Sequence, residues 1–349
     1  MAISGLPTMR IPCFQIACFS LLCAVLLLGI APAAHAVSCT VSAGMSASER
    51  TALETAASNL GGDVARGDTA ALQAGSAQLL ASNFGEIAAT VGGLAQSLKG
   101  ATVTVESLYA LHAGDLTGTE SDVQFFCSRP ASPLLVTATL GQLPPGEYAL
   151  TIVHASGVAA PQQFAFVLQN VLHDTAASHA TAQWQLAGFF VRPLTLGGHP
   201  ELWFWEQARA MKNAPLSAYL YYEAAAYLSR PADLYTSGNL DKLNRETSAV
   251  EPKGLPGDTP MLLSGPGGNA FSVTGMRIDT SLGAMDLRVD ANVGALGDAV
   301  TSRKSALDLM SALLTKYPDL RESFHGLWVF EKATDGQAYA VEQPMSALQ

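Results

Sequence analysis

Two histidines and one aspartate lie within seven residues of one another in the stretch HDTAASH. Their side chains, on His173, Asp174 and His179, are of types that bind zinc. A catalytic zinc also requires a ligand on a rigid element, whereas the surrounding NVLHDTAASHATAQ has the composition of a loop between two strands. We therefore expect a solvated hairpin loop there, and we expect no metal or cofactor in the protein.

Four further histidines are scattered singly along the chain: His112, His154, His199 and His325. A histidine acts as a general base only beside an orienting acid and a substrate. His325 follows Glu322 closely and His199 precedes Glu201, and we expect both pairs to be structural. The chain contains no nucleophile elbow, phosphate loop or dinucleotide fingerprint, and its glycine-rich SGPGG segment is typical of a turn. The sequence thus assigns no catalytic residue.

Aromatic residues concentrate in QWQLAGFFVRPLTLGGHPELWFWEQA, residues 183–208, which holds three of the four tryptophans. The first part of this stretch is predicted to be a strand, in which side chains alternate between two faces. One face would carry Trp184, Leu186, Gly188, Phe190 and Arg192, and the other Gln185, Ala187, Phe189 and Val191. Because both faces carry an aromatic ring, we expect the strand to be covered on both sides.

The two helices predicted after this strand are apolar around most of their circumference. PELWFWEQARAMK carries four consecutive apolar residues, and PLSAYLYYEAAAYLSR carries four tyrosines. Burial at a seam between layers explains them, since each buried aromatic removes about 150–250 Å² from water. A groove for a carbohydrate or hydrophobic ligand would use the same residues. The lining of such a groove would be Trp184, Phe190, Trp203, Trp205, Tyr221 and Tyr222.

The elements that position these residues begin with helices over residues 46–98. Ser46 and Asp68 are predicted N-terminal caps, and Leu72, Leu79 and Leu80 are predicted to form one apolar stripe. From residue 101 to residue 193, the pattern of apolar residues changes from helical periodicity to strand-like alternation. This pattern predicts about six antiparallel strands. Helices followed by an antiparallel sheet define an α+β fold class.

Two local patterns refine the predicted sheet. In TVTVESLYAL, the residues expected on one face are Val103, Val105, Ser107 and Tyr109. The PPG sequence at 144–146 lies between two runs rich in β-branched residues. It predicts a hairpin turn, because proline fixes φ and glycine accepts a positive φ.

The sequence predicts five successive regions. Residues 1–36 form a signal peptide, 37–193 a helix-plus-sheet α+β domain, 194–250 a helical hairpin bridge, 251–260 a linker, and 261–349 a ββαββ two-layer domain. The linker prediction rests on the proline and glycine content of EPKGLPGDTP.

Residues 46–193 resemble the nuclear transport factor two-like fold, a cone-shaped α+β fold. The resemblance rests on element order, on the helical opening DVARGDTAAL and on the closing strand WQLAGFFV. It implies small-molecule binding in a cone, catalysis by an inward acid and histidine, or dimerisation through the sheet, but it transfers no catalytic residue. That fold places helices around its first strand, whereas here the helices are N-terminal. The whole chain also resembles uncharacterised exported bacterial proteins with the order LPPGEYAL, W.LAGFF.RP and GH..LW.W, which implies no activity.

The N-terminus predicts export. Arg10 precedes an apolar core, CFSLLCAVLLLGIA, and AHA ends the segment with small residues, as in a cleaved signal peptide. A membrane anchor is the alternative, but this core is shorter than the ~20 residues that a spanning helix needs. The chain carries 19 Lys and Arg against 29 Asp and Glu, without a basic cluster, which disfavours nucleic acid and anionic membrane surfaces as partners.

Cysteine usage fits an oxidising compartment. Of the five cysteines, only Cys39 and Cys127 follow the predicted cleavage site, and we expect them to form a disulfide. The alternative is acylation of Cys39, although AVSC matches a lipoprotein motif poorly.

The sequence therefore predicts an exported periplasmic or secreted protein without a transmembrane span in its mature chain. The expected role is non-catalytic binding of a small ligand, an envelope component or a protein partner. The alternatives are a cone-type hydrolase or isomerase, and a structural envelope protein. Homo-oligomers are compatible with each of these roles.

Overall fold

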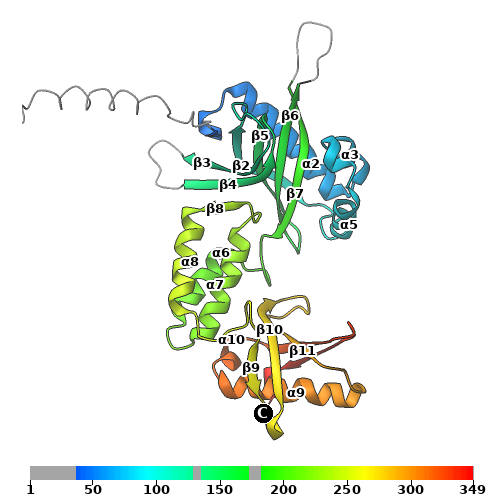
Figure 1. The fold of residues 1–349 in the computed structure, drawn as a ribbon, viewed down its shortest axis with the longest axis vertical. Helices are drawn as coiled ribbons and strands as arrows, with labels where there is room; N and C mark the ends of the chain where they lie inside the picture. The colour runs from blue at the N-terminus through cyan, green and yellow to red at the C-terminus, as the bar shows by residue number, and fades with distance from the viewer. Residues whose placement is uncertain (1–36, 129–134, 173–181, 349) are drawn as a thin grey trace, which may run out of the picture. The chain divides into compact units, whose positions relative to one another are not determined.

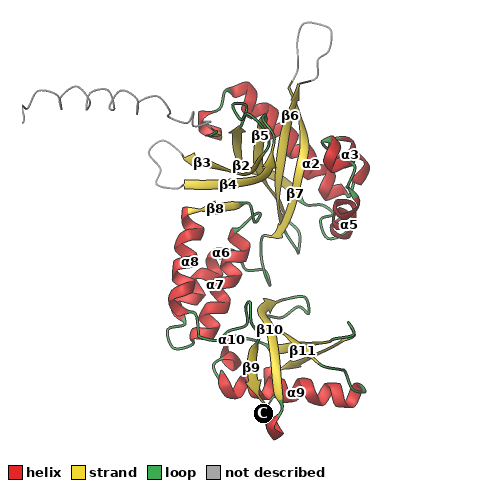
Figure 2. Cartoon of the chain, in the orientation of Figure 1, coloured by secondary structure: helices red, strands yellow, loops and turns green. Residues whose placement is uncertain are grey.

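The computed structural model describes residues 37–128, 135–172 and 182–348 (Figure 1). The predicted signal peptide and the HDTAASH segment lie outside these residues. Helices and strands occupy separate stretches of the chain (Figure 2), which confirms the α+β class. No helix among the described residues is long and apolar enough to cross a bilayer.

A short helical layer follows the first strand. The helices are α2 (Ala47–Arg66), α3 (Thr69–Ala74), α4 (Gln78–Ala81) and α5 (Gly85–Leu94). Both predicted caps are confirmed, because Ser46 accepts a hydrogen bond from the Glu49 N–H and Asp68 from the Ala71 N–H. Gly67 ends α2 at a φ of 70°, where a residue with a Cβ would be strained.

The helices cover one face of a five-stranded antiparallel sheet (Figure 1). Its order is β1-β2-β5-β6-β7, formed by β1 (Ser38–Val41), β2 (Thr102–His112), β5 (Glu147–Ser156), β6 (Gln162–Leu172) and β7 (Ala182–Pro193). Leu53 and Val64 of α2 pack against Phe164 and Phe166 of β6 in this helix–sheet core. Burial of these apolar side chains holds the layers together.

A second, three-stranded sheet packs on the other face. It consists of β3 (Glu120–Ser128), β4 (Leu135–Leu143) and β8 (Tyr235–Ser237), in the order β3-β4-β8. Phe125 and Leu140 contribute to the core between the two sheets, with Leu150 and Ala165 from the larger sheet. The domain is therefore built as helices, sheet and sheet.

The hairpin predicted at the PPG sequence is wrong. Pro144 to Gly146 connect β4 to β5, but these strands belong to different sheets. The Gly146 backbone hydrogen-bonds with that of Ala113, which extends the β2–β5 ladder instead. Gly146 does not adopt a positive φ, so the predicted use of glycine in this turn is wrong as well. The pairing of the strands depends on the contacts between the two layers.

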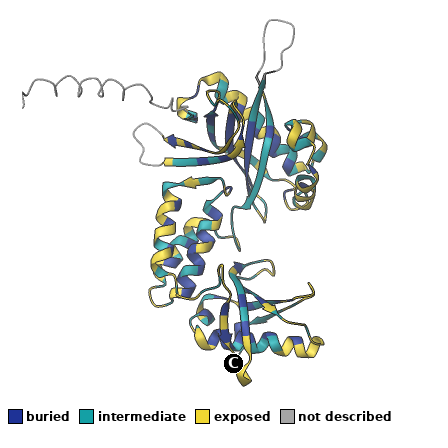
Figure 3. Ribbon diagram, viewed as in Figure 1, coloured by how far each residue is buried: buried dark blue, intermediate teal, exposed yellow. Residues whose placement is uncertain are grey.

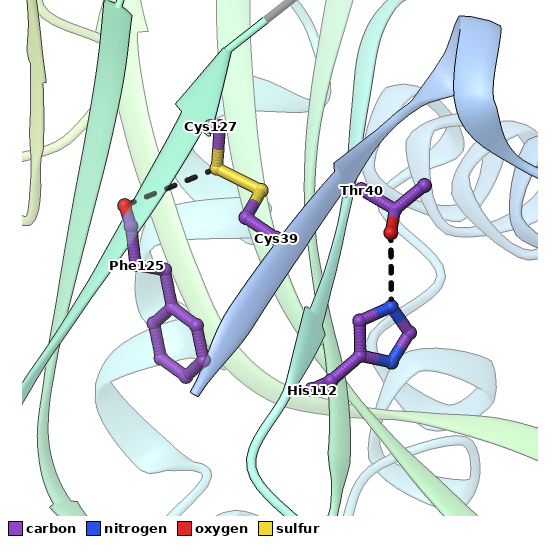
Figure 4. The surroundings of a disulfide bond; sticks show 5 residues. All are labelled: Cys39, Thr40, His112, Phe125 and Cys127. Atoms are coloured by element: carbon purple, nitrogen blue, oxygen red, sulfur yellow. Dashed lines mark hydrogen bonds between the residues drawn. A yellow bond between two sulfur atoms is a disulfide. The ribbon is translucent and has the colours of Figure 1, made fainter. Parts of the chain in front are cut away.

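The Cys39–Cys127 disulfide is confirmed (Figure 4). It joins β1 of the larger sheet to β3 of the smaller one, with the two Cα atoms 5.0 Å apart. Beside it, the Thr40 hydroxyl and the His112 Nε2 are 3.2 Å apart. The bond links the two sheets directly and closes a separation of 88 residues.

The face assignments in β2 and β7 are wrong beyond a β-bulge in each strand. In β2 the register shifts between Val105 and Ser107, and Leu108 then joins the helix–sheet core while Tyr109 packs in the sheet–sheet core. In β7 the extra residue is Ala187, because Leu186 pairs with Leu168 and Gly188 with Val167. One inserted residue moves every later side chain to the opposite face.

The C-terminal half begins with α6 (Glu201–Ala210), α7 (Pro215–Ser229) and α8 (Gly238–Val250). It continues with a mixed sheet of order β13-β12-β11-β10-β9 and helices α9 (Ala299–Lys316) and α10 (Leu320–Ser323). The strands are β9 (Met261–Ser264), β10 (Ala270–Asp279), β11 (Asp286–Val293), β12 (Gly326–Ala333) and β13 (Ala338–Pro344). The expected ββαββ order is present, with β9 added at one side and with β11 and β12 parallel.

Helices α6 to α8 share one hydrophobic core with this sheet. Phe204, Leu220 and Leu240 from the helices belong to the same buried cluster as Val289 and Leu313. Helix α7 is buried around most of its circumference (Figure 3), as its sequence predicted. The region predicted as a linker, 251–260, therefore connects two parts of a single core.

Candidate functional site

The N-terminal half contains an apolar cleft where β4 meets β6 and β7. Its volume is about 510 Å³, within the range of small-molecule sites. Several residues that line the cleft also belong to the core between the two sheets, so the cleft lies next to that core. Its apolar lining includes Leu79, Leu80, Leu140, Leu143, Val167, Ala187 and Phe190.

Helix α4 forms one wall of this apolar cleft because the segment before it is bound to β7. The Ala77 N–H donates to the Leu186 carbonyl at 2.8 Å, and the Leu186 N–H donates to the Gly75 carbonyl at 2.9 Å. This pairing holds Leu79 at the cleft, where its side chain is 81% exposed. The single stripe predicted for Leu72, Leu79 and Leu80 is wrong at Leu79. The helix ends at Gly75, and Leu72 and Leu80 pack in the helix–sheet core whereas Leu79 is exposed.

Backbone conformation shapes the opposite wall. Gln142, at the end of β4, has a φ of 52°, which is uncommon for a residue with a side chain. Such strain concentrates at functional sites. On the other side of the cleft, Gly188 has no side chain to fill the space. A Cβ added at this position would lie 3.2 Å from the Val167 Cβ.

The cleft lining is uncharged. Among the residues described there, the polar side chains are the amides of Asn83, Gln142 and Gln169 and the hydroxyls of Thr139 and Tyr148. The Tyr148 hydroxyl donates to the Pro144 carbonyl at 3.0 Å, and burial raises the pKa of Tyr148, so the phenol stays protonated. The lining can therefore bind apolar surface and hydrogen-bond a neutral polar group.

The six aromatics predicted for a ligand groove do not come together. Phe190 lines the apolar cleft, whereas Trp184 lies on the helix-covered side of β7, beside α2. The Ala187 bulge separates them, because it turns Phe190 to the sheet–sheet side. The other four lie around the helical hairpin.

Trp205 and Tyr222 belong to a polar network on the helices. The Trp205 indole N–H donates to Glu246 at 2.7 Å, and the Tyr222 hydroxyl lies 3.4 Å from the same carboxylate. Arg209 binds both oxygens of Glu246, at 2.7 and 2.8 Å. This hydrogen bonding lowers the pKa of Glu246 to about 2.

Trp203 and Tyr221 pack in the C-terminal core. His199 stacks on Trp203 with ring centroids 3.8 Å apart, and Trp203 packs against Tyr221 at 5.9 Å. The Tyr221 hydroxyl donates to the Ser323 carbonyl at 3.0 Å. The Tyr221 contact joins the hairpin to α10, and the helices share their core with the C-terminal sheet and not with the sheet that contains β7.

His112, His154 and His325 are not among the residues that line the apolar cleft. The His112 Nδ1 lies 2.6 Å from Glu147, and burial lowers the pKa of His154, so that His154 is neutral at pH 7. His325 lies 3.0 Å from Asp286 rather than beside Glu322. His173, Asp174 and His179 lie outside the described residues.

Most of the cleft was missed by sequence reasoning. Leu140, Leu143 and Val167 lie on strands that pattern alone assigns to an ordinary core. The available signal was the adjacent pair Leu79 and Leu80, because two neighbouring leucines cannot both face one core from a short helix.

Comparison with known proteins returned no matches: no family model, no curated protein and no solved structure matches the chain.

Proposed function

We propose that this is an exported protein that binds a small, uncharged, largely apolar molecule in the apolar cleft. The observation that carries the proposal is the exposure of Leu79, at 81%, on a cleft that other apolar side chains already line. A lone exposed leucine is ordinary, but one that completes a concave apolar surface is typical of a ligand site. The amides of Asn83, Gln142 and Gln169 supply the polar contacts that would orient a ligand.

The uncharged lining favours binding over catalysis. Hydrolysis or isomerisation in a cone requires an acid, a base or an activated nucleophile beside the substrate. The described lining of the cleft contains no Asp, Glu, His, Cys, Lys or Arg. Binding of a cone-type ligand also agrees with the resemblance to the nuclear transport factor two-like fold.

Two features support export. The disulfide between Cys39 and Cys127 is of the kind that persists in oxidising compartments. The N-terminal segment has the order of a cleaved signal peptide, with Arg10, an apolar core and AHA.

The experiment titrates mature protein with the neutral fluorescent probe N-phenyl-1-naphthylamine. Leu79→Ser should weaken probe binding about tenfold, because the contact of one leucine is worth roughly 1.5 kcal/mol. The matched control is Leu262→Ser on β9, which is 75% exposed and remote from the cleft. Ala187→Trp, which fills the cleft, should abolish binding.

Equal affinities for Leu79→Ser and Leu262→Ser, together with unchanged binding by Ala187→Trp, would contradict the proposal. Native mass spectrometry of protein purified from its own envelope fraction then identifies the natural ligand by an adduct that is lost on denaturation. A bare chain in that experiment, with no probe binding, would make a protein partner the better assignment.

A further inference from the structure

Three potential metal ligands from neighbouring strands meet at one end of the C-terminal sheet. Asp286 begins β11, His325 immediately precedes β12, and Glu342 lies in β13. Each offers one ligand atom, and these atoms all lie within 4.8 Å of one another. The closest pair is the His325 Nδ1 and the Asp286 Oδ1, which are 3.0 Å apart.

Gly326 makes this convergence possible. It lies in β12, the strand between β11 and β13. A Cβ at Gly326 would lie 2.6 Å from the Glu342 Oε1 and 3.0 Å from the Asp286 Oδ1. The two carboxylates therefore occupy the space over this glycine, and any side chain there would push them apart.

Among the described residues, no lysine or arginine forms an ion pair with either carboxylate. The side chain of Asp286 is only 2% exposed, and its ion-pair partner in the described structure is His325. The Glu342 Oε1 is shielded from solvent and accepts no hydrogen bond from the described residues. Arg288, two residues after Asp286, is bound to Asp290 at 2.8 Å instead.

Such an arrangement is costly unless a positive charge binds to it. A buried carboxylate without a partner loses its hydration, and two adjacent carboxylates repel each other. A divalent cation held by both carboxylates and by the imidazole would offset these costs.

We propose that Asp286, His325 and Glu342 bind a divalent transition metal of the zinc class. One imidazole nitrogen with two carboxylate oxygens suits zinc, whereas magnesium and calcium prefer ligand sets made only of oxygen. Two atoms that each lie 2.0–2.2 Å from a common tetrahedral zinc are separated by about 3.4 Å. The closest pair here, at 3.0 Å, therefore needs to open by only a few tenths of an ångström to accept the ion. The His325 side chain is 55% exposed, so water can reach the site and complete the coordination.

The test is a calorimetric titration of the mature chain with zinc alone. All variants carry His173→Gln and His179→Gln, so that these two imidazoles cannot contribute. We expect one zinc per chain and at least a tenfold loss of affinity in Glu342→Gln and in His325→Gln. Glu322→Gln removes an exposed acid near His325 and should leave the affinity unchanged. Magnesium should give no heat of binding.

A second measurement distinguishes the loss of a metal ligand from the loss of the fold. Cobalt in place of zinc should give a visible absorption band that His325→Gln weakens or shifts, because the imidazole nitrogen is a ligand. Unchanged zinc affinity in Glu342→Gln would overturn the proposal. So would the absence of zinc binding by the folded mature chain.

Discussion

Glu246 accepts hydrogen bonds from three side chains that are distant in the sequence. They belong to Arg209, Trp205 and Tyr222, which are 37, 41 and 24 residues away. The Arg209 guanidinium also lies over the Trp205 ring, 4.6 Å from its centroid. A carboxylate bound at both oxygens and by an indole N–H is stabilised in its charged form. The network ties α8 to α6.

Glu246→Gln should therefore destabilise the protein by about 1 kcal/mol at pH 7, the size expected for a partly exposed bidentate pair. Folding depresses this pKa to about 2, so the stabilisation is present above the ordinary glutamate pKa and is lost as pH falls toward 2. Urea unfolding of both proteins at pH 7, 4 and 3 measures the difference. Glu206→Gln, an exposed acid on the same helix as Arg209, is the control and should change little.

The pKa of Glu331 is shifted in the opposite direction to that of Glu246. Its side chain is buried on β12, and Ser305 donates to the Oε1 at 2.7 Å while the Oε2 has no partner among the described residues. Burial raises the pKa of Glu331, because its charged form is poorly solvated there.

Glu331→Gln should stabilise the protein at pH 7, by about 1 kcal/mol, because it removes a poorly solvated charge. The pKa of Glu331 is higher in the folded than in the unfolded protein. The contribution of this group to wild-type stability is therefore greatest below the pKa of the unfolded state, and it falls as pH rises through the pKa of the folded state. The gain should therefore shrink between pH 7 and pH 4 in denaturant titrations. A gain that stays constant with pH would show that Glu331 is not the titrating group.

At this scale the sequence predicted residue types better than residue partners. His325 was expected to pair with Glu322, yet it binds Asp286 of β11. Arg209 likewise binds Glu246 of α8 rather than Glu206 on its own helix. The true partners come together only through packing of whole helices and strands. Local spacing contains no information about that packing.

Helices and strands were predicted well wherever the signal was local. The caps at Ser46 and Asp68, the prolines at the starts of α6 and α7, and the helix α9 all follow from nearby residues. The predicted strand faces are wrong beyond Glu106 and beyond Ala187. A bulge at each position changes the alternation of side chains without any change in composition. The short strands β1, β8 and β9 were missed, since their pairing partners and not their own residues define them.

The bulge in β7 leads to a prediction about deletions. Deletion of Ala187 removes the bulge but keeps Leu186 and Phe189 on the helix side, so packing is preserved. Deletion of Gln185 instead turns Trp184 away from the helix–sheet core. The second deletion should cost about 2 kcal/mol more, the value of burying a large apolar side chain. Thermal unfolding of both deletion variants tests this, and equal losses would contradict the assigned register.

At the scale of the whole molecule, the disulfide joins the two sheets of the N-terminal half. Removing it with Cys39→Ser and Cys127→Ser should lower the free energy of unfolding by about 3–4 kcal/mol, given a closed loop of 88 residues. Chemical denaturation with and without reductant provides the measurement. Reductant should destabilise the wild type by a similar amount and leave the double variant unaffected.

Strand β8 has a consequence for dividing the protein into fragments. It pairs with Val136 to Ala138 of β4, although it belongs to the segment between α7 and α8. A fragment that ends at Pro193 would leave β4 as an open edge, free to add strands from other chains and aggregate. A fragment extended through α8 would instead expose the apolar sides of Phe204 and Leu220 to water. A cut on either side of the segment 194–250 therefore exposes either a strand edge or the apolar side of a helix.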